Sequence, residues 1–143
     1  MRRNISRVKV LSELYQYDLL NQQLNVDNFD ELLKEVDDTD IEYDYIFASS
    51  LYRGVIDNIA RIDRLIALCL EKYPLDRLSY VDRSLLRIGT YEMLYTKTPH
   101  NIIINEIVNL SKEYSQTEEH KTSKFNNAVL DAISKTIKMK ENK

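Results

Sequence analysis

The clearest chemistry in this sequence lies in the basic side chains at its start. We call residues 1–12 the basic arm. It contains no acid and four cations, Arg2, Arg3, Arg7 and Lys9. Arginine binds phosphate oxygens through two parallel hydrogen bonds. A helix N-terminus carries partial positive charge, so each basic residue there costs roughly a few tenths of a kcal/mol unless a ligand offsets the repulsion. The basic arm therefore predicts contact with phosphates, and hence with a nucleic acid.

Two further features favour RNA over DNA as the nucleic acid. Tyr15 and Tyr17 follow the basic arm, and tyrosine rings stack on unpaired bases with about 1–3 kcal/mol each. No predicted helix carries enough basic residues to fill a DNA major groove by itself. The whole chain has a net charge of −3, and nine acids fall within residues 25–45. This acidic stretch suits a basic protein partner.

Residue types that support catalysis are sparse. His100 and His120 stand far apart, so we expect surface side chains, and Cys69 lies on an apolar stripe, so we expect a core residue. A single cysteine excludes an internal disulfide and fits a reducing compartment. With two glycines in the chain, no glycine-rich turn can cradle a phosphate. We therefore expect a binding protein rather than an enzyme, with no metal and no cofactor.

The elements that position these residues are predicted to be helices. The chain has 143 residues, 43% of them hydrophobic, and two prolines besides its two glycines, which disfavours turn-rich β architectures. No apolar run approaches the roughly 20 residues of a membrane helix, and no apolar stretch follows the charged N-terminus as in a secretory signal. We expect an all-α, cytoplasmic protein that does not bind membranes.

The first predicted helix covers residues 5–21. Its apolar stripe recurs every three or four residues and consists of Ile5, Val8, Leu11, Tyr15 and Leu19. At 100° per residue, Arg3 and Arg7 fall on one side of this stripe, and Arg2 and Lys9 fall on the other. We therefore expect the basic residues to flank the buried face.

Helical periods and capping signals place the remaining elements. Thr39 and Glu42 form a capping box before a long apolar run, which we expect to break near residue 60. Ser79 is a suitable N-cap, with Asp82 in the first turn of the helix that follows. Residues 115–123 read as a loop. The predicted stretches after the first helix are 27–37, 45–69, 80–95, 101–115 and 125–137.

Five motifs in order along the chain resemble the NusB family. The arginine-rich start and LYQ-x-D of the family correspond to Arg3, Leu14, Tyr15, Gln16 and Asp18, and its ID-x-x-I corresponds to Ile62-Asp63. Its VDR-x-x-LR-x-x-x-YE segment corresponds to residues 81–92. Its P-x-x-x-x-INE stretch corresponds to Pro99 with residues 104–106, and its KFxNGVLD to residues 124–131. Departures include Tyr73 in place of tryptophan. Asn126 and Ala128 replace an apolar residue and a glycine near the RNA surface that the resemblance implies.

The resemblance implies an all-α fold of about seven helices in two small packed bundles, residues 1–73 and 74–143. It also implies a bacterial transcription antitermination factor. Such proteins bind the single-stranded boxA element of ribosomal RNA transcripts together with NusE, a small-subunit ribosomal protein. The pair joins the antitermination complex on RNA polymerase. A homodimer stays open as an alternative to a monomer.

Carried over residue by residue, the resemblance assigns two surfaces. The RNA contacts would be Arg2, Arg3, Arg7, Lys9, Gln16, Lys124 and Phe125. The NusE contacts would be Asp82 in an exposed first turn, Arg83 and Glu92. Phe125 either stacks on a base or begins the core of the last helix. Arg87 and Glu92 are spaced too far apart to pair along one helix face, so each should meet another helix or a partner.

Two alternatives compete with this assignment. The chain is either a helical protein-interaction module without an RNA role, using the acidic residues 25–45, or a helix-turn-helix DNA binder using residues 75–97. The second alternative needs more exposed basic residues than Arg83 and Arg87.

Overall fold

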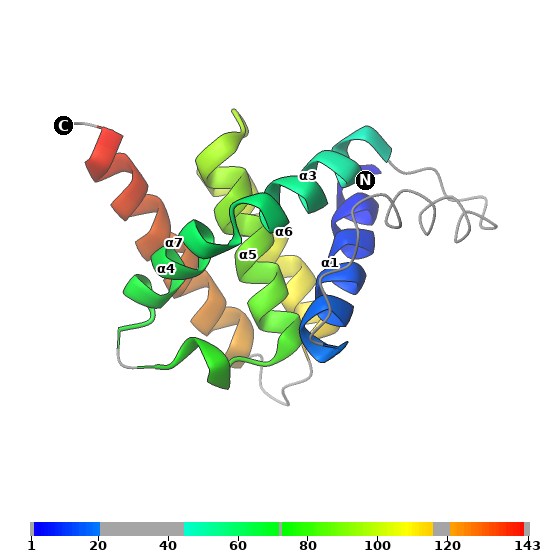
Figure 1. The fold of residues 1–143 in the computed structure, drawn as a ribbon. Coiled ribbons are helices and arrows are strands. Elements are labelled where there is room, and N and C mark those ends of the chain that lie inside the picture. The colour runs from blue at the N-terminus through cyan, green and yellow to red at the C-terminus, as the bar shows by residue number, and fades with distance from the viewer. Residues whose placement is uncertain (1, 21–44, 72, 116–120, 142–143) are drawn as a thin grey trace.

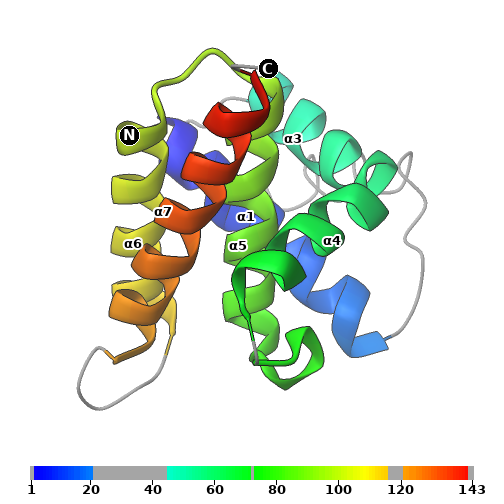
Figure 2. The ribbon, with the colours of Figure 1, turned by 90° about the vertical axis from the view of Figure 1, so that its left-hand side faces the viewer.

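The protein is an arrangement of helices around one central helix, α5 (Figures 1 and 2). The structure, a computed structural model, describes residues 2–20, 45–71, 73–115 and 121–141. Within these ranges it contains six α-helices, one short 3₁₀ helix and no strand, which confirms the all-α prediction. The helices are α1 (Arg2–Leu20), α3 (Tyr45–Asp57), α4 (Ile59–Cys69), η1 (Leu75–Arg77), α5 (Tyr80–Tyr95), α6 (His100–Tyr114) and α7 (Lys121–Glu141).

The helix boundaries follow the local signals in the sequence. The run over 45–69 breaks at Asn58, whose side-chain amide donates to the carbonyl of Gly54 at 2.8 Å. Ser79 caps α5, because its hydroxyl accepts a hydrogen bond from the backbone N–H of Asp82 at 3.1 Å. The last helix begins at Lys121, earlier than expected. The predicted helix over 27–37 and the capping box at residues 39–42 lie outside the described residues.

Helix α5 forms the centre of the core. It packs against α1, α3, α4, α6 and α7, and ten of its sixteen residues are buried. Both glycines lie at close approaches to this helix. A Cβ atom on Gly54 would lie 2.1 Å from a ring atom of Tyr91, and one on Gly89 would lie 3.0 Å from Leu130. The glycines therefore let α3, α6 and α7 approach α5 closely. The division into two bundles near residue 73 stays a prediction.

Helix α1 turns a different face to the core from the one predicted. Val10 and Leu14 are fully buried, whereas Leu19 is 53% exposed. Tyr15, which we expected on the buried stripe, is exposed. The apolar positions of this helix offer two overlapping stripes, and the contacts with α3 and α5 select the one that includes Val10 and Leu14.

Candidate nucleic-acid interface

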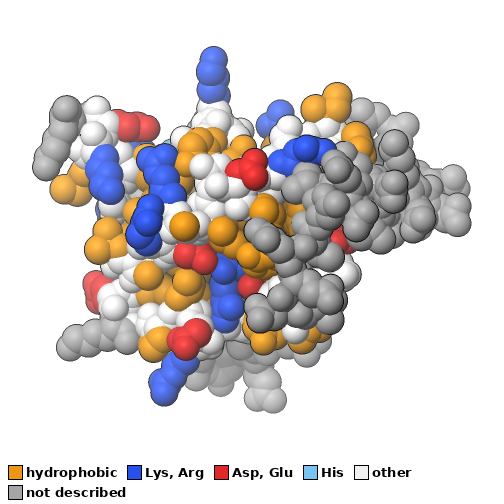
Figure 3. Space-filling model, in the orientation of Figure 1, with side chains coloured by type: hydrophobic (Ala, Val, Ile, Leu, Met, Phe, Trp, Pro, Cys, Tyr) orange, Lys and Arg blue, Asp and Glu red, His pale blue; other side chains and the backbone are white. Residues whose placement is uncertain are grey.

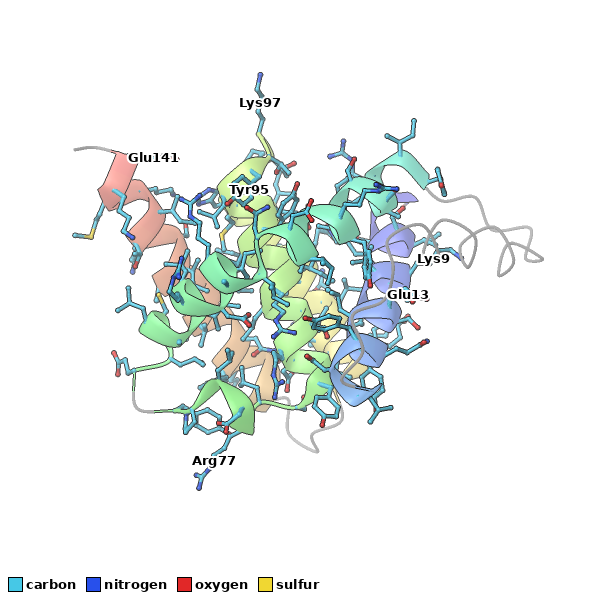
Figure 4. The ribbon with its side chains drawn as sticks, viewed as in Figure 1. Lys9, Glu13, Arg77, Tyr95, Lys97 and Glu141 are labelled. Carbon is cyan, nitrogen blue, oxygen red and sulfur yellow. The ribbon has the colours of Figure 1, made fainter. Side chains whose placement is uncertain are left out.

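Residues 2–12 of the basic arm form the first turns of α1, and the described cations among them have different surroundings. Arg3 is exposed, with its guanidinium carbon 4.9 Å from the centre of the Phe47 ring on α3. Lys9 is partly buried, and Figure 4 shows it pointing away from the helical body. Gln16 lies seven residues after Lys9, nearly two helical turns on, so both fall on one line of the α1 surface. The side chain of Arg2 lies outside the described structure.

Arg7 lies in the interior, and the expectation that it flanks the buried face is wrong. Its side chain is 4% exposed and forms two hydrogen bonds to the carboxylate of Glu92, at 2.8 and 2.7 Å. Glu92 itself is 0% exposed. Arg7 also donates to Asn4 at 2.6 Å, and Asn4 donates to Glu106. Neither Arg7 nor Glu92 can reach a ligand at the surface in this arrangement, so both act by joining α1 to α5.

A second charged cluster joins α1, α4 and α5. Arg87 forms hydrogen bonds to Asp63 at 2.8 Å and to Asp18 at 3.0 Å. Burial lowers the pKa of Arg87, but the hydrogen bonds and charges of the two carboxylates outweigh it and raise the pKa above its ordinary value. The guanidinium is therefore held charged. The prediction that Arg87 and Glu92 each meet another helix is confirmed.

Asp82 is buried, and its expected exposure in the first turn of α5 is wrong. One carboxylate oxygen accepts from the Ser79 hydroxyl at 2.8 Å, and the other accepts from the side-chain amide of Asn126 at 3.0 Å. The same amide donates to Ser111 at 3.0 Å. Asn126, expected near the RNA surface, is therefore 0% exposed. This cluster connects the start of α5 with α6 and α7.

Arg83 keeps a partly exposed side chain beside this cluster. Its guanidinium carbon lies 5.4 Å from the centre of the Tyr80 ring, and it donates to the backbone carbonyls of Asp76 and Leu78 at 3.3 Å. An oxygen of Asp18 lies 3.7 Å away. Of the three residues predicted to bind a partner protein, Arg83 is thus the one whose side chain is partly accessible.

Aromatic side chains gather at the N-terminal end of α5. Tyr15 meets Tyr80 edge to face, with ring centres 5.8 Å apart, and Tyr73 packs against Phe125 at 5.5 Å. Tyr15, Tyr80 and Tyr114 also line a surface hollow of about 700 Å³. Exposed tyrosine faces next to polar groups can stack on unpaired bases. Tyr80 and Tyr114 could not be recognised as site residues from the sequence, because a single tyrosine gives no local signal of a shared hollow.

The predicted RNA contacts that stay accessible come from α1 and from the start of α7. Phe125 is half-buried against Tyr73, and Lys124 is exposed beside it at the start of α7. Gln16 is exposed near the end of α1. Arg3 lies thirteen residues before Gln16, which is about 20 Å along the helix. The hollow therefore adjoins Gln16 rather than Arg3, and the exposed line of α1 leads from the basic arm toward it.

The histidine and cysteine positions differ in part from expectation. His100 is half-buried and bridges two helices: its Nδ1 lies 2.6 Å from the Ser134 hydroxyl and its Nε2 lies 3.2 Å from the Met93 carbonyl. It is not a simple surface side chain. Cys69 is half-buried, with its sulfur 3.7 Å from the Thr136 hydroxyl. In the described ranges, no group of three or more His, Cys, Asp or Glu side chains lies close enough to hold a metal ion.

The helix-turn-helix alternative does not fit the fold. Its recognition helix would be α5, which is the central and mostly buried helix. A recognition helix must enter a groove of DNA with an exposed face. The acidic residues 25–44 of the other alternative, and His120, lie outside the described structure. No helix in the described part is long and apolar enough to cross a membrane.

Known proteins resemble this chain over nearly its whole length. The sequence model of the NusB family matches residues 4–135. The transcription antitermination protein NusB of Campylobacter jejuni subsp. doylei is 39% identical over 132 residues, covering 92% of this chain and 95% of that protein. The solved structure of T. maritima NusB superposes with a TM-score of 0.79 at 35% identity, covering 94% of this chain and 92% of that one. A crystal structure of antitermination factors NusB and NusE in complex with dsRNA gives a TM-score of 0.76 at 31% identity, with coverages of 93% and 96%.

Proposed function

The chain belongs to the NusB family, and on this premise we propose that it is a transcription antitermination factor that binds the boxA element of ribosomal RNA transcripts together with NusE. The observation that carries the proposal is the family match over nearly the whole chain. A solved relative of the same fold, described as NusB with NusE and dsRNA, supports an RNA and a protein partner. The complex of protein, NusE and RNA would then join RNA polymerase.

The proposed RNA path follows the exposed line of α1 into the aromatic hollow. Lys9 and Gln16 supply a cation and a hydrogen-bonding amide along this line, and Tyr15 and Tyr80 supply stacking faces at its end. Lys124 adds a cation at the start of α7. Arg7 is removed from the path because its guanidinium is used by Glu92.

The protein partner is proposed to approach beside the same end of α5. Arg83 presents donors there next to the Tyr80 ring. Asp82 acts indirectly, because its carboxylate fixes the start of α7 through Asn126. Glu92 is assigned to the core and not to the partner surface.

The test is a titration of fluorescently labelled boxA RNA with and without NusE at several salt concentrations. NusE should tighten binding. Binding of single-stranded RNA weakens with salt with a slope of about −0.7 per phosphate contacted, so about four contacts predict a slope near −3. Lys9→Gln and Lys124→Gln should each reduce the slope by about 0.7. The matched control is Lys97→Gln, since Lys97 is exposed beyond the other end of α5 (Figure 4).

Point substitutions are needed because truncation does not isolate the basic arm. Deletion of residues 1–9 removes Arg7 and leaves Glu92 buried without its cation, so loss of binding would then report on folding. If Lys9→Gln and Lys124→Gln bind RNA with the unchanged slope, the proposed RNA path is refuted. If the native protein binds NusE but not boxA RNA, it is an interaction module without an RNA role, and the proposed function fails.

A further inference from the structure

A second surface feature lies away from the proposed RNA path. It is a groove of about 580 Å³ lined by residues of α4 and α7 and by Leu94 of α5. Its apolar lining comes from all three helices and consists of Leu65, Leu68, Leu94 and Ile137. Leu68 is 64% exposed, which is high for a leucine beside other accessible apolar groups. Leu65 and Leu94 are half-buried and Ile137 is 5% exposed, so the apolar surface that the groove leaves in contact with water comes mainly from α4.

Cations stand at both edges of this groove. Arg61 and Arg64 line the α4 edge, and Lys140 lines the α7 edge, against one acid, Glu141. Arg61 is held by the Tyr95 hydroxyl at 2.9 Å. Arg64 and Lys140 are exposed and have no ion-pair partner within the described ranges. Figure 3 shows blue side chains among orange ones over α4 and the end of α7, at the left of the view.

Helix electrostatics explain some of these charges but not all. A lysine in the last turn of α7 suits the partial negative charge at a helix C-terminus, which accounts for Lys140. Arg64 lies in the second turn of α4, where that explanation does not hold. Arg64 forms no ion pair within the part of the chain that the structure describes, so its exposed guanidinium is available to an acidic partner.

The chemistry of the lining favours a protein over a nucleic acid. No aromatic side chain lines the groove, so it offers no platform for base stacking. Its aliphatic walls match the apolar stripe of an amphipathic helix, which binds in a groove through side chains spaced three and four residues apart. The positive edges require acids on both sides of that stripe. Leu94 lies fourteen residues from Tyr80 of the hollow, about 20 Å along α5, so the two surfaces can be occupied together.

We propose that the groove between α4 and α7 binds an acidic amphipathic helix of a partner protein. The apolar stripe of that helix packs on Leu65, Leu68, Leu94 and Ile137, and its flanking carboxylates pair with Arg64 and Lys140. The proposal does not rest on RNA binding. The surface would let one molecule hold a second protein while its α1 face is occupied.

The test uses a designed fluorescent peptide of about 15 residues, roughly four helical turns, with leucines three and four apart and glutamates elsewhere. A second peptide carries lysines in place of the glutamates. Fluorescence anisotropy should show that the full-length protein binds the acidic peptide and not the basic one. The double variant Arg64→Glu with Lys140→Glu should bind the acidic peptide about tenfold more weakly, since it loses two rim pairs and gains two repulsions. It should also gain affinity for the basic peptide.

Two further variants separate the groove from general charge effects. Leu68→Glu should abolish binding of the acidic peptide without unfolding the protein, because this side chain is largely exposed. Lys112→Glu, an exposed change on α6, should leave peptide binding unchanged. All variants should retain boxA RNA binding and thermal midpoint. The proposal is overturned if both peptides bind alike, if Lys112→Glu weakens binding as much as the groove variants, or if a short oligouridylate RNA displaces the acidic peptide. It is also overturned if Leu68→Glu dissociates a dimer of this chain, which would assign the groove to a second copy.

Discussion

Replacement of Arg7 by methionine separates a structural role of this arginine from an RNA-binding role. The native guanidinium forms two hydrogen bonds to Glu92, and the two side chains are 4% and 0% exposed. Methionine keeps an unbranched stem of similar reach but removes the charge and all donors. Glu92 would then be a buried carboxylate without its cation, and the side-chain oxygen of Asn4 would lose the hydrogen bond that Arg7 donates to it.

The magnitude follows from the burial of the pair. Removing one partner of a buried ion pair costs about 3–5 kcal/mol, because the remaining charge stays desolvated. Domains of this size unfold with about 5–15 kcal/mol in total, so Arg7→Met should remove a large part of the stability. In a chain of this length, each kcal/mol of lost stability lowers the thermal midpoint by roughly 3–4 °C, so the midpoint should fall by about 9–20 °C.

The assay is urea and thermal unfolding followed by circular dichroism, together with boxA RNA binding below the transition. Arg3→Met is the matched control for unfolding, because Arg3 is exposed on the same helix and the folded protein loses only a cation–π contact of about 0.5–1 kcal/mol. Combining Arg7→Met with Glu92→Leu should recover most of the loss, since an apolar pair can replace a buried ion pair. A midpoint within about 2 °C of the native protein, together with weakened RNA binding, would refute the reasoning.

Three further substitutions test local features of the fold by urea unfolding. Gly54→Ala should destabilise by about 1–3 kcal/mol, because its Cβ would lie 2.1 Å from the Tyr91 ring; in a Tyr91→Ala background the same change should instead stabilise by up to about 1 kcal/mol through helix propensity. Burial raises the pKa of the Glu13 carboxyl above its ordinary value of 4.5, so the folded state binds the carboxyl proton more tightly than the unfolded state does. The stability of the folded state therefore falls as the pH rises from 4.5 to the raised pKa of Glu13. Glu13→Gln should therefore stabilise at about pH 7 and lose this gain below about pH 4. Ser79→Ala should cost about 1 kcal/mol, because the N-cap bond to Asp82 is lost, and a cost below about 0.3 kcal/mol would contradict the capping role.

Local signals in the sequence were sufficient for most helix boundaries. The cap at Ser79 and the break at Asn58 depend on residues within four positions of each other. Side-chain chemistry of this kind acts over one turn and can be recognised without the fold. The same holds for the NusB motifs, which the family match supports.

Exposure could not be predicted where a distant residue decides it. Arg7 looked like a free cation, and its partner Glu92 lies 85 positions away. Asp82 occupies an N-terminal helix turn that is usually exposed, and Asn126 covers it from another helix. Helical periodicity also does not reveal that His100 joins two neighbouring helices. In each case the sequence does not reveal which helices pack against each other in the fold.

The two buried ion pairs between α1 and α5 have opposite polarity, and this has a consequence for folding. Arg7 of α1 meets Glu92, whereas Asp18 of the same helix meets Arg87. If α1 docked in the reverse direction, Arg7 would face Arg87 and Asp18 would face Glu92, so both contacts would be repulsive. The charge order thus discriminates between the two directions in which α1 can dock. Exchanging the members of the Arg7–Glu92 pair would keep a buried ion pair in the native state, but it would make both directions electrostatically acceptable. Such a variant should keep most of the stability of the native state, but a larger fraction of its molecules should fold with α1 docked in the wrong direction.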